Sequence, residues 1–304
     1  MSGGGNEQQG AARFGPCVST GVEGLDDILG GGLPQGHMYL VEGESGAGKT
    51  TLGMQFLLEG QRLGERTLWI SLSEAESELQ QVASSHGWSL DGITIANPAT
   101  PALESDPDKQ YSFFAPGDVE LDEIRSAVIA AVEHTRPTRV VFDPFSDIRH
   151  LSRDVLRYRR QVLALRQLFA ECGCTALLMQ EVTRSGEGDL QAEALVHGYL
   201  TMHQESAEYG GQRRRLRVHK MRGIPFRDGY HDFAITTGGI EVYPRLVASE
   251  HVEALPMATL ASHVPELDAL LGGGLRRGSS TLLMGPAGVG KSIIATQFVH
   301  TAAR

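Results

Sequence analysis

Short apolar runs alternate with longer segments of helical periodicity along most of the chain. The apolar runs fall at residues 38–42, 67–72, 93–97, 138–143 and 175–179. Each is short enough to predict a buried β-strand. The segments between them place apolar residues on one helical face, as at Leu52, Phe56 and Leu57, and predict helices at 50–62, 76–86, 121–134 and 155–172. Residues 98–116 are interrupted by prolines and predict a loop.

Strands that alternate with helices predict βαβ crossovers, and therefore an α/β fold with a mainly parallel central sheet that helices cover on both faces. After Gln180 the pattern changes. Short strands are predicted at 216–221, 230–235 and 240–243, with glycine turns at Gly223 and Gly238–Gly239. These strands indicate an antiparallel β extension that follows the parallel sheet.

A glycine-rich pattern, G-x-x-x-x-G-K-[ST], occurs twice, at 43–50 and at 285–292. This is the P-loop, whose backbone N–H groups cradle phosphate oxygens at a helix N-terminus, while its lysine neutralises charge and its hydroxyl residue holds Mg²⁺. We therefore expect ATP and Mg²⁺ as cofactors. The predicted nucleotide-binding residues are Gly43, Glu44, Ser45, Gly46, Ala47, Gly48, Lys49, Thr50 and Thr51 in the first copy, and Gly288, Gly290, Lys291 and Ser292 in the second.

The surroundings of the two P-loops repeat in register. Gly285 lies 242 positions after Gly43, and the same offset relates Asp26 to Asp268 and the glycine run 30–32 to 272–274. We interpret this as an internal duplication. The expected organisation is a flexible tail at 1–14, an ATPase domain at 15–247, and a linker with the first part of a second domain at 248–304.

Composition narrows the possible classes of protein. The net charge of −10 is unfavourable for nonspecific nucleic-acid binding. No apolar stretch of about 20 residues is present, and the N-terminus does not read as a signal peptide, so we expect a cytoplasmic protein without membrane contact. Cys17, Cys172 and Cys174 are predicted to be free thiols.

Two acidic residues follow predicted strands, at the edge where parallel sheets bind ligands. Asp143 ends the run 138–143 and is the candidate that holds Mg²⁺ together with Thr50; alternatively, it is a turn residue before Pro144. Glu74 follows the run 67–72 and is the candidate base that orients the attacking water. It could also be a carboxylate that only stabilises the start of the next helix.

Phosphoryl transfer also needs cations beside the transferred phosphate, and Lys220 and Arg222 are the candidates. Alternation along a strand predicts that their side chains share one face. The alternative is that they continue a solvated, charged hairpin face begun by 213–217.

The segment 20–26, the run 30–34 and the P-loop together resemble the opening of the KaiC family of ATPases, which are relatives of RecA and RadA. Further matches are 87–90, 139–143, 220–223, 233–236 and 239–242. The resemblance implies a RecA-like fold and a hexameric ring with ATP between subunits. It also implies phosphate and Mg²⁺ binding by Lys49 and Thr50, a Walker B role for Asp143, and a reach of Lys220 and Arg222 into the neighbour's site.

The chain departs from the family pattern at two places. The family commonly has adjacent glutamates after the second strand, whereas this chain has Ser73 before Glu74. A small hydroxyl residue and a histidine often follow the Lys-x-Arg-Gly motif, whereas here Ile224, Pro225 and Phe226 follow. Both departures bear on the rate of hydrolysis more than on nucleotide binding.

Three hypotheses for function follow. The first is a KaiC-type ATP-hydrolysing ring that acts in signalling or circadian-type timing through regulatory partner proteins. The second is a serine/threonine autokinase of the same family, with its kinase half incomplete in this chain. The third is a RecA/RadA-like DNA-repair ATPase, which the segment 181–197 disfavours because its acidic residues outnumber its single Arg184.

Overall fold

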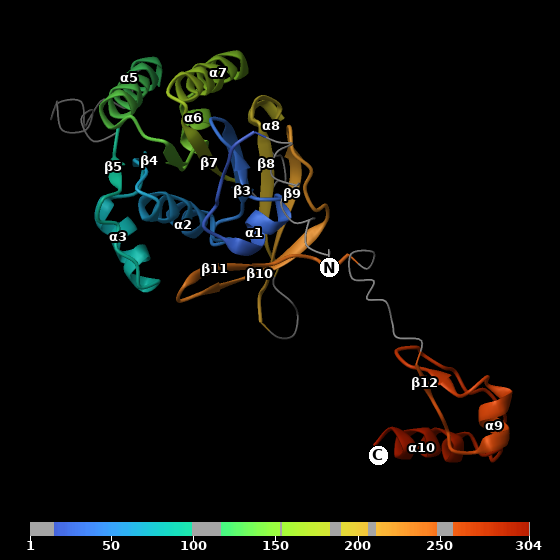
Figure 1. Cartoon of the computed structure of the whole chain (residues 1–304). Coiled ribbons are helices and arrows are strands. Elements are labelled where there is room, and N and C mark those ends of the chain that lie inside the picture. Colours follow the sequence, from blue (N-terminus) through green and yellow to red (C-terminus); the bar gives the residue numbers. More distant parts are fainter. Residues whose placement is uncertain are drawn as a thin grey trace, which may run out of the picture. The chain divides into compact units, whose positions relative to one another are not determined.

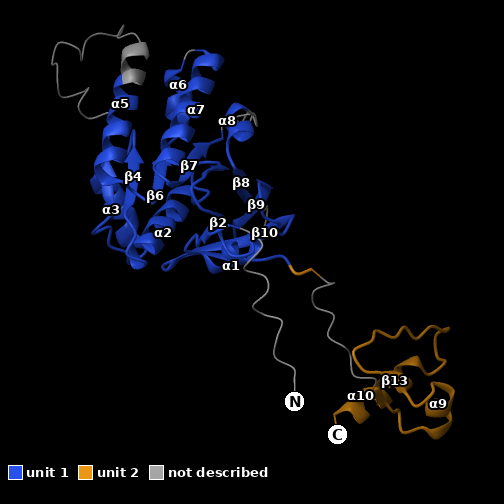
Figure 2. Cartoon of the chain, turned by 45° about the horizontal axis from the view of Figure 1, so that its top comes forward, with its two compact units in different colours: residues 1–245 blue, residues 246–304 orange. Residues whose placement is uncertain are grey.

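The structure is a computed structural model that describes residues 15–98, 117–152, 154–182, 190–205, 211–247 and 258–303. The chain divides into two compact units, residues 1–245 and 246–304 (Figure 2). The expected tail at 1–14, most of the proline-punctuated loop, the acidic stretch at 183–189 and most of the expected linker lie outside the described residues.

A sheet of nine described strands crosses the larger unit in the order β11-β10-β9-β8-β3-β7-β6-β4-β5. The pairs from β8 through β3 to β5 are parallel, and the pairs from β8 to β11 are antiparallel. This arrangement confirms the predicted α/β class with its antiparallel extension. The strands are β3 (Met38–Gly43), β4 (Thr67–Ser71), β5 (Thr94–Ala96), β6 (Arg139–Asp143), β7 (Thr175–Glu181), β8 (Gly198–Glu205), β9 (Arg213–Met221), β10 (Tyr230–Thr236) and β11 (Gly239–Tyr243).

Helices cover both faces of the parallel part (Figure 1). On one face lie α1 (Glu23–Ile28), α2 (Lys49–Arg62) and α3 (Glu76–Ser85); on the other lie α5 (Gly117–Thr135), α6 (Ser146–Leu151), α7 (Val155–Glu171) and α8 (Leu190–Leu195). Along β3, Tyr39 and Val41 pack into the first hydrophobic cluster, and Met38 and Leu40 pack into the second. Because both faces are buried, the strand shows a continuous apolar run instead of an alternating one.

Several elements were not predicted. Strand β8 lies directly beside β3, but only Leu200 and Met202 of its middle are fully apolar and buried, so its sequence has a weak strand signal. Helices α1, α6 and α8 have six residues each, too few for a clear helical period. Strand β1 (Cys17–Val18) pairs with β2 (Leu33–Pro34) in a separate small sheet that was also missed.

Strand β9 is longer than predicted and includes the arginine run. Arg213 forms an ion pair with Asp232, and Arg215 forms one with Glu205, both across neighbouring strands. These pairs support the interpretation of the arginine run as a charged hairpin face. Arg222 falls just after the end of β9, so it does not continue the strand, but its side chain and that of Lys220 still lie on the same side, toward α8.

The smaller unit contains β12 (Thr259–Leu260), α9 (Pro265–Leu270), β13 (Leu275–Arg276) and α10 (Lys291–Ala302). Its local geometry repeats that of the larger unit. Asp26 Oδ1 accepts a hydrogen bond from the backbone N–H of Thr20 at 2.7 Å, and Asp268 Oδ1 accepts one from that of Ser262, also at 2.7 Å. The structural repeat therefore follows the sequence repeat.

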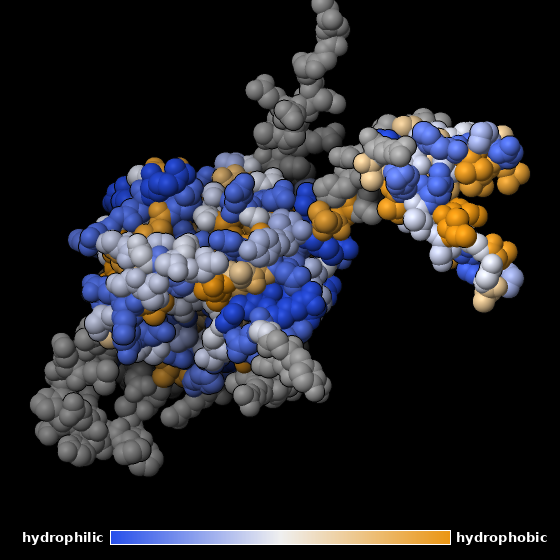
Figure 3. Space-filling model, turned by 90° about the horizontal axis from the view of Figure 1, so that it is seen from below, coloured by the Kyte–Doolittle hydropathy of each residue, from blue (hydrophilic) through white to orange (hydrophobic). Residues whose placement is uncertain are grey.

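One element does not repeat. Residues 280–285 correspond to β3, yet they form no strand. In the larger unit β3 is hydrogen-bonded between β7 and β8, whereas the described residues of the smaller unit include no strand to pair with 280–285. Leu282 and Met284 are therefore 80% and 82% exposed. Figure 3 shows hydrophobic residues on the surface of this unit.

Candidate nucleotide-binding site

The first P-loop connects the central strand β3 to α2. Gly48 has a φ of +103°, and a side chain at this position would place its Cβ 2.8 Å from Cδ1 of Ile235. Only glycine meets both conditions, because other residues rarely adopt a positive φ. The turn directs the first backbone N–H groups of α2, which begins at Lys49, toward the open end of the sheet. This is the geometry of an anion cradle at a helix N-terminus.

The side chain of Lys49 folds back over the P-loop. Its Nζ donates hydrogen bonds to the carbonyl oxygens of Gly43 at 2.9 Å and Glu44 at 3.0 Å. Burial lowers the pKa of Lys49, and the negative charges of Asp143 and Glu74 partly oppose that shift. The ammonium group is thus held at the mouth of the cradle, where carboxylates surround it.

Thr50 and Asp143 meet beside the cradle. Thr50 Oγ1 donates a hydrogen bond to Asp143 Oδ2 at 2.9 Å. Asp143 is only 5% exposed at the carboxyl end of β6, and burial raises its pKa to about 7. The hydrogen bond from Thr50 opposes this shift, and the negative charge of Glu74 adds to it.

These two side chains fit Mg²⁺. A hydroxyl and a carboxylate are the hard oxygen ligands that this ion takes, usually together with water and substrate phosphates. A buried carboxylate that is costly to ionise gains most from a nearby cation. The described residues contain no group of three or more His, Cys, Asp or Glu side chains that could hold a metal ion by themselves.

Glu74 lies next to this pair. Strands β4 and β6 are in register, with Ser71 opposite Asp143. The Ser71 hydroxyl accepts a hydrogen bond from the Glu74 backbone N–H at 3.0 Å and donates one to its carbonyl oxygen at 2.8 Å, which fixes the loop. Burial raises the pKa of Glu74, and repulsion from Glu78 raises it further. A carboxylate with a raised pKa suits a proton acceptor in a cleft.

Two acidic residues at the site were missed by sequence reasoning. Glu181 ends β7 opposite Gly43, and its charge acts on both Lys49 and Asp147. Burial raises the pKa of Asp147, which lies in the first turn of α6. Glu181 follows a buried strand, so the rule that identified Asp143 could also have identified it. Asp147 gives no such signal, because α6 was not predicted.

Lys220 and Arg222 lie away from the P-loop of their own unit. Their side chains donate to backbone carbonyls of α8, with Lys220 Nζ 2.6 Å from the Glu193 oxygen and Arg222 Nη2 3.2 Å from the Ala194 oxygen. Lys220 pairs with Tyr199, which is level with Leu40 near the start of β3, whereas the cradle follows the other end of that strand. The two cations are thus close to each other, at the opposite end of the sheet from the cradle.

The second cradle reproduces the backbone of the first. Gly288 and Gly290 have φ values of +81° and +93°, close to the +79° and +103° of Gly46 and Gly48. Lys291 Nζ donates to the carbonyl oxygens of Gly285 and Pro286 at 2.7 Å each, as Lys49 does to those of Gly43 and Glu44. Among the residues that the structure describes, no carboxylate bonds to Ser292 as Asp143 does to Thr50.

No helix among the described residues is both long and apolar enough to cross a membrane. The fold and the cradle together define a P-loop protein of the RecA-like class, in which the cradle follows β3 and Asp143 ends β6, with β7 between them in one parallel sheet.

Comparison with known proteins specifies the family. Residues 18–247 and 260–304 match the family described as "ATPase: KaiC", so the chain belongs to the KaiC family of ATPases. Membership of this family implies nucleotide binding. The structure of a KaiC-like protein from the archaeon Pyrococcus horikoshii OT3 is similar, with a TM-score of 0.61 at 24% identity over 75% of this chain and 99% of that one, which supports the fold.

Curated relatives are circadian clock oscillator proteins named KaiC. The protein of Parasynechococcus marenigrum (strain WH8102) is 28% identical over 94% of this chain and 56% of its own length. The protein of Thermostichus vulcanus is 29% identical over 93% of this chain and 55% of its own length. The chain therefore spans about half the length of these relatives.

Proposed function

We propose that the larger unit hydrolyses ATP, and that the protein acts as a KaiC-type ring in signalling or timing through partner proteins. The observation that carries the proposal is the convergence of Lys49, Thr50, Asp143 and Glu74 at the carboxyl ends of β3, β6 and β4. The four groups supply the parts that phosphoryl transfer requires, which are a cradle, a metal site and a base.

Each side chain has a separate task in this mechanism. Thr50 and Asp143 would hold Mg²⁺, which would neutralise phosphate charge. Lys49 exchanges its hydrogen bonds to Gly43 and Glu44 for bonds to the phosphates. Glu74 orients the attacking water and accepts its proton, which its raised pKa favours.

The proposal of a ring is based on the distance between the cradle and the two cationic side chains, Lys220 and Arg222. Lys220 and Arg222 lie near the start of β3, and five residue steps of about 3.3 Å each separate Met38 from Gly43, which is about 16 Å along the strand. Side chains at that distance act more readily on the nucleotide of a neighbouring subunit than on their own. An arginine supplied in trans is a recurring device in phosphoryl transfer.

The proposal is tested by incubating the full chain with γ-labelled ATP and Mg²⁺ and following both released phosphate and label retained on the protein. We expect release without stable labelling. Lys49→Ala should abolish nucleotide binding, whereas Glu74→Gln should bind nucleotide and hydrolyse it about a hundredfold more slowly. Arg160→Gln, an exposed change on α7, is the control with wild-type release.

Normal turnover in Glu74→Gln would show that Glu74 is not the base. Stable label on the protein would instead favour the autokinase hypothesis, with an acceptor within this chain. Absence of release from the wild-type protein under conditions where nucleotide binds would contradict the proposed hydrolysis.

A further inference from the structure

Two cysteines flank a single glycine in the turn that connects α7 to β7. Cys172 directly follows the last residue of α7, Gly173 has a φ of +67°, and Cys174 directly precedes β7. The backbone N–H of Gly173 donates to the carbonyl oxygen of Ala170 at 3.1 Å. That of Cys174 donates to the carbonyl oxygen of Phe169 at 2.8 Å. These are the two bonds of a Schellman motif, so the backbone of the turn is fixed by the end of the helix.

The side chains of the two cysteines interact with each other but differ in exposure. Cys172 is exposed and Cys174 is buried. The Cys174 thiol donates a hydrogen bond to the carbonyl oxygen of Pro137 at 2.9 Å. The pKa of Cys174 is raised to about 12, chiefly by burial, and further by the charge of Cys172 and a hydrogen bond between the two side chains. The two sulfur atoms therefore lie within hydrogen-bonding distance of each other.

The backbone of the turn meets the spacing that a disulfide needs. Two peptide units join the Cα atoms of Cys172 and Cys174, which places them at most about 7 Å apart in an extended chain. The turn at Gly173 shortens this distance, and the Cα atoms of a disulfide usually lie roughly 4.4–6.8 Å apart. Formation of the bond therefore needs side-chain rotation, chiefly of Cys174 away from Pro137.

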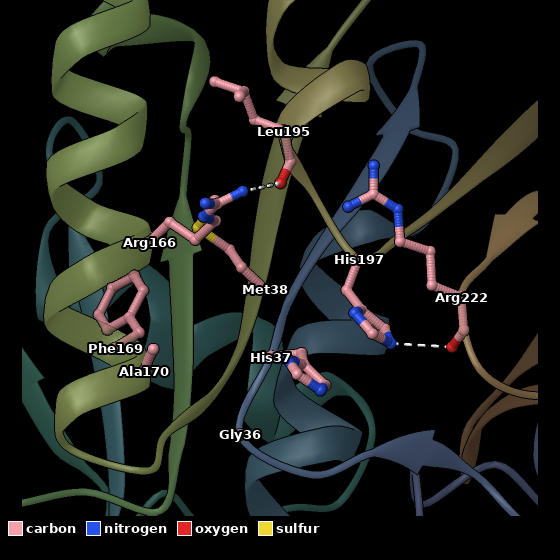
Figure 4. Close-up of a pocket in the computed structure, with 9 residues that line it drawn as sticks. All are labelled: Gly36, His37, Met38, Arg166, Phe169, Ala170, Leu195, His197 and Arg222. Atoms are coloured by element: carbon pink, nitrogen blue, oxygen red, sulfur yellow. Dashed lines mark hydrogen bonds between the residues drawn. The ribbon is translucent and has the colours of Figure 1, made fainter.

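Small molecules have access to this end of α7. A pocket of about 150 Å³ lies between the helix and the start of β3. Figure 4 shows its lining, which includes Phe169 and Ala170, whose carbonyl oxygens fix the turn, as well as Arg166 and Arg222. Because Cys172 is itself exposed, an oxidant as small as hydrogen peroxide meets this thiol before the buried one.

We propose that Cys172 and Cys174 form a redox modification site, a dithiol that a peroxide converts reversibly into a disulfide. The sulfur of Cys172 first attacks hydrogen peroxide, which gives a sulfenic acid and releases one water. The sulfur of Cys174 then attacks the sulfenic sulfur, which forms the S–S bond and releases a second water. In total, two thiols and one peroxide give one disulfide and two waters, and two electrons pass from sulfur to the peroxide oxygens. The reaction uses no nucleotide, so the proposal is independent of ATP hydrolysis.

Oxidation changes the turn locally. It removes the S–H donor that Cys174 presents to Pro137, and it joins the end of α7 covalently to the residue before β7. The disulfide closes a loop with one intervening residue, and such a short loop gains little stability from chain entropy. We therefore expect a bond that thiol reagents reverse, and no large change in the free energy of unfolding.

The test is oxidation of the reduced full chain with hydrogen peroxide. The remaining thiols are alkylated in denaturant, and the tryptic peptide 167–184, which carries both cysteines, is analysed by mass spectrometry. We expect this peptide to resist alkylation and to be about 2 Da lighter than the dithiol, and to regain both thiols with dithiothreitol. Cys17→Ser, which removes an exposed thiol elsewhere in the unit, is the control and should give the same result.

Two variants test the order of the steps. Cys174→Ala should stop at the sulfenic acid of Cys172, which dimedone traps. Cys172→Ser should slow the modification of Cys174 about tenfold or more, because a buried thiol with a raised pKa presents little thiolate. Cys172 is exposed, so its replacement by serine should leave the fold intact.

A sulfinic acid on Cys172 of the wild-type protein, with Cys174 still a thiol, would overturn the proposal. So would disulfides that join either cysteine to Cys17 or to a second chain in place of the bond between the two. Modification of Cys174 at the wild-type rate in Cys172→Ser would show that Cys172 is not the thiol that reacts first.

Discussion

At the scale of single residues, the environment of Asp143 has the clearest chemical consequence. It is an acid whose position at the end of a strand was visible in the sequence, but its burial was not. Burial raises its pKa to about 7, against a usual value of 3.8. Metal binding requires the ionised form, so the site depends on a group that is half-protonated near neutral pH.

We expect the Mg²⁺-dependent part of ATP affinity to weaken as the pH falls below about 7, by up to tenfold for each further pH unit. Calorimetric titrations at pH 6 and pH 8, with and without Mg²⁺, measure this change. Asp143→Asn should remove both the metal-dependent affinity and its pH dependence. Equal affinities at the two pH values in the wild-type protein would contradict the metal role of Asp143.

The raised pKa of Asp143 also affects the stability of the protein in the absence of nucleotide. The protonated acid is favoured in the folded state, so between about pH 4 and pH 7 the folded protein binds more protons than the unfolded protein at this site. Its contribution to the free energy of unfolding therefore falls as the pH rises through that range. Urea denaturation should show that the free energy of unfolding falls less steeply with pH in Asp143→Asn than in the wild-type protein over this range, because the amide does not titrate.

At the scale of elements, Arg139 joins parts of the chain that the sequence shows only separately. Its guanidinium is fully buried at the start of β6 and donates to the carbonyl oxygens of Ser19 at 2.7 Å and Phe56 at 2.9 Å. It also pairs with Glu65 at 2.6 Å. One side chain thus connects the segment before α1, helix α2 and the turn before β4.

We expect Arg139→Met to lower the free energy of unfolding by about 3 kcal/mol, because it leaves buried acceptors without their donor. Chemical denaturation measures the loss. Arg62→Met is the control on α2: its ion pair with Glu59 is exposed, so little change is expected. Equal stabilities of the two variants would show that the buried contacts of Arg139 contribute no more than a surface pair.

At the scale of the whole molecule, the two ends of β3 carry different parts of the proposed chemistry. The cradle follows Gly43, and Lys220 and Arg222 lie level with the strand's first half. A closed ring of subunits would bring one end of each sheet against the other end of the next sheet. The rate of ATP hydrolysis should then depend on whether the subunits have assembled into rings.

We expect Arg222→Ala to reduce turnover at least tenfold at protein concentrations where rings form, and to leave the lower turnover of dissociated protein unchanged. Phosphate release measured over a dilution series, with sedimentation to define the oligomer, makes the comparison. Arg213→Ala, on the exposed charged face of β9, is the matched control. An equal loss in assembled and dissociated protein would contradict a role in trans.

The sequence by itself determined the local features of this protein. The glycines that need a positive φ, the strands buried on both faces, and the acids at strand ends all depend on short stretches of chain, and their patterns are specific. The placement of Asp143 at the end of its strand, and of Glu74 just after the end of its strand, therefore follows from the strand pattern alone.

Only the tertiary structure decided which segments pair. Residues 38–43 form a strand because β7 and β8 flank them, whereas the equivalent residues 280–285 form none. The missed strand β8, the additional acid Asp147 and the pocket formed by Arg166 and Arg222 also depend on residues far apart in the chain. Hydrogen-bond partners and burial are properties of the packed molecule, and a local pattern cannot contain them.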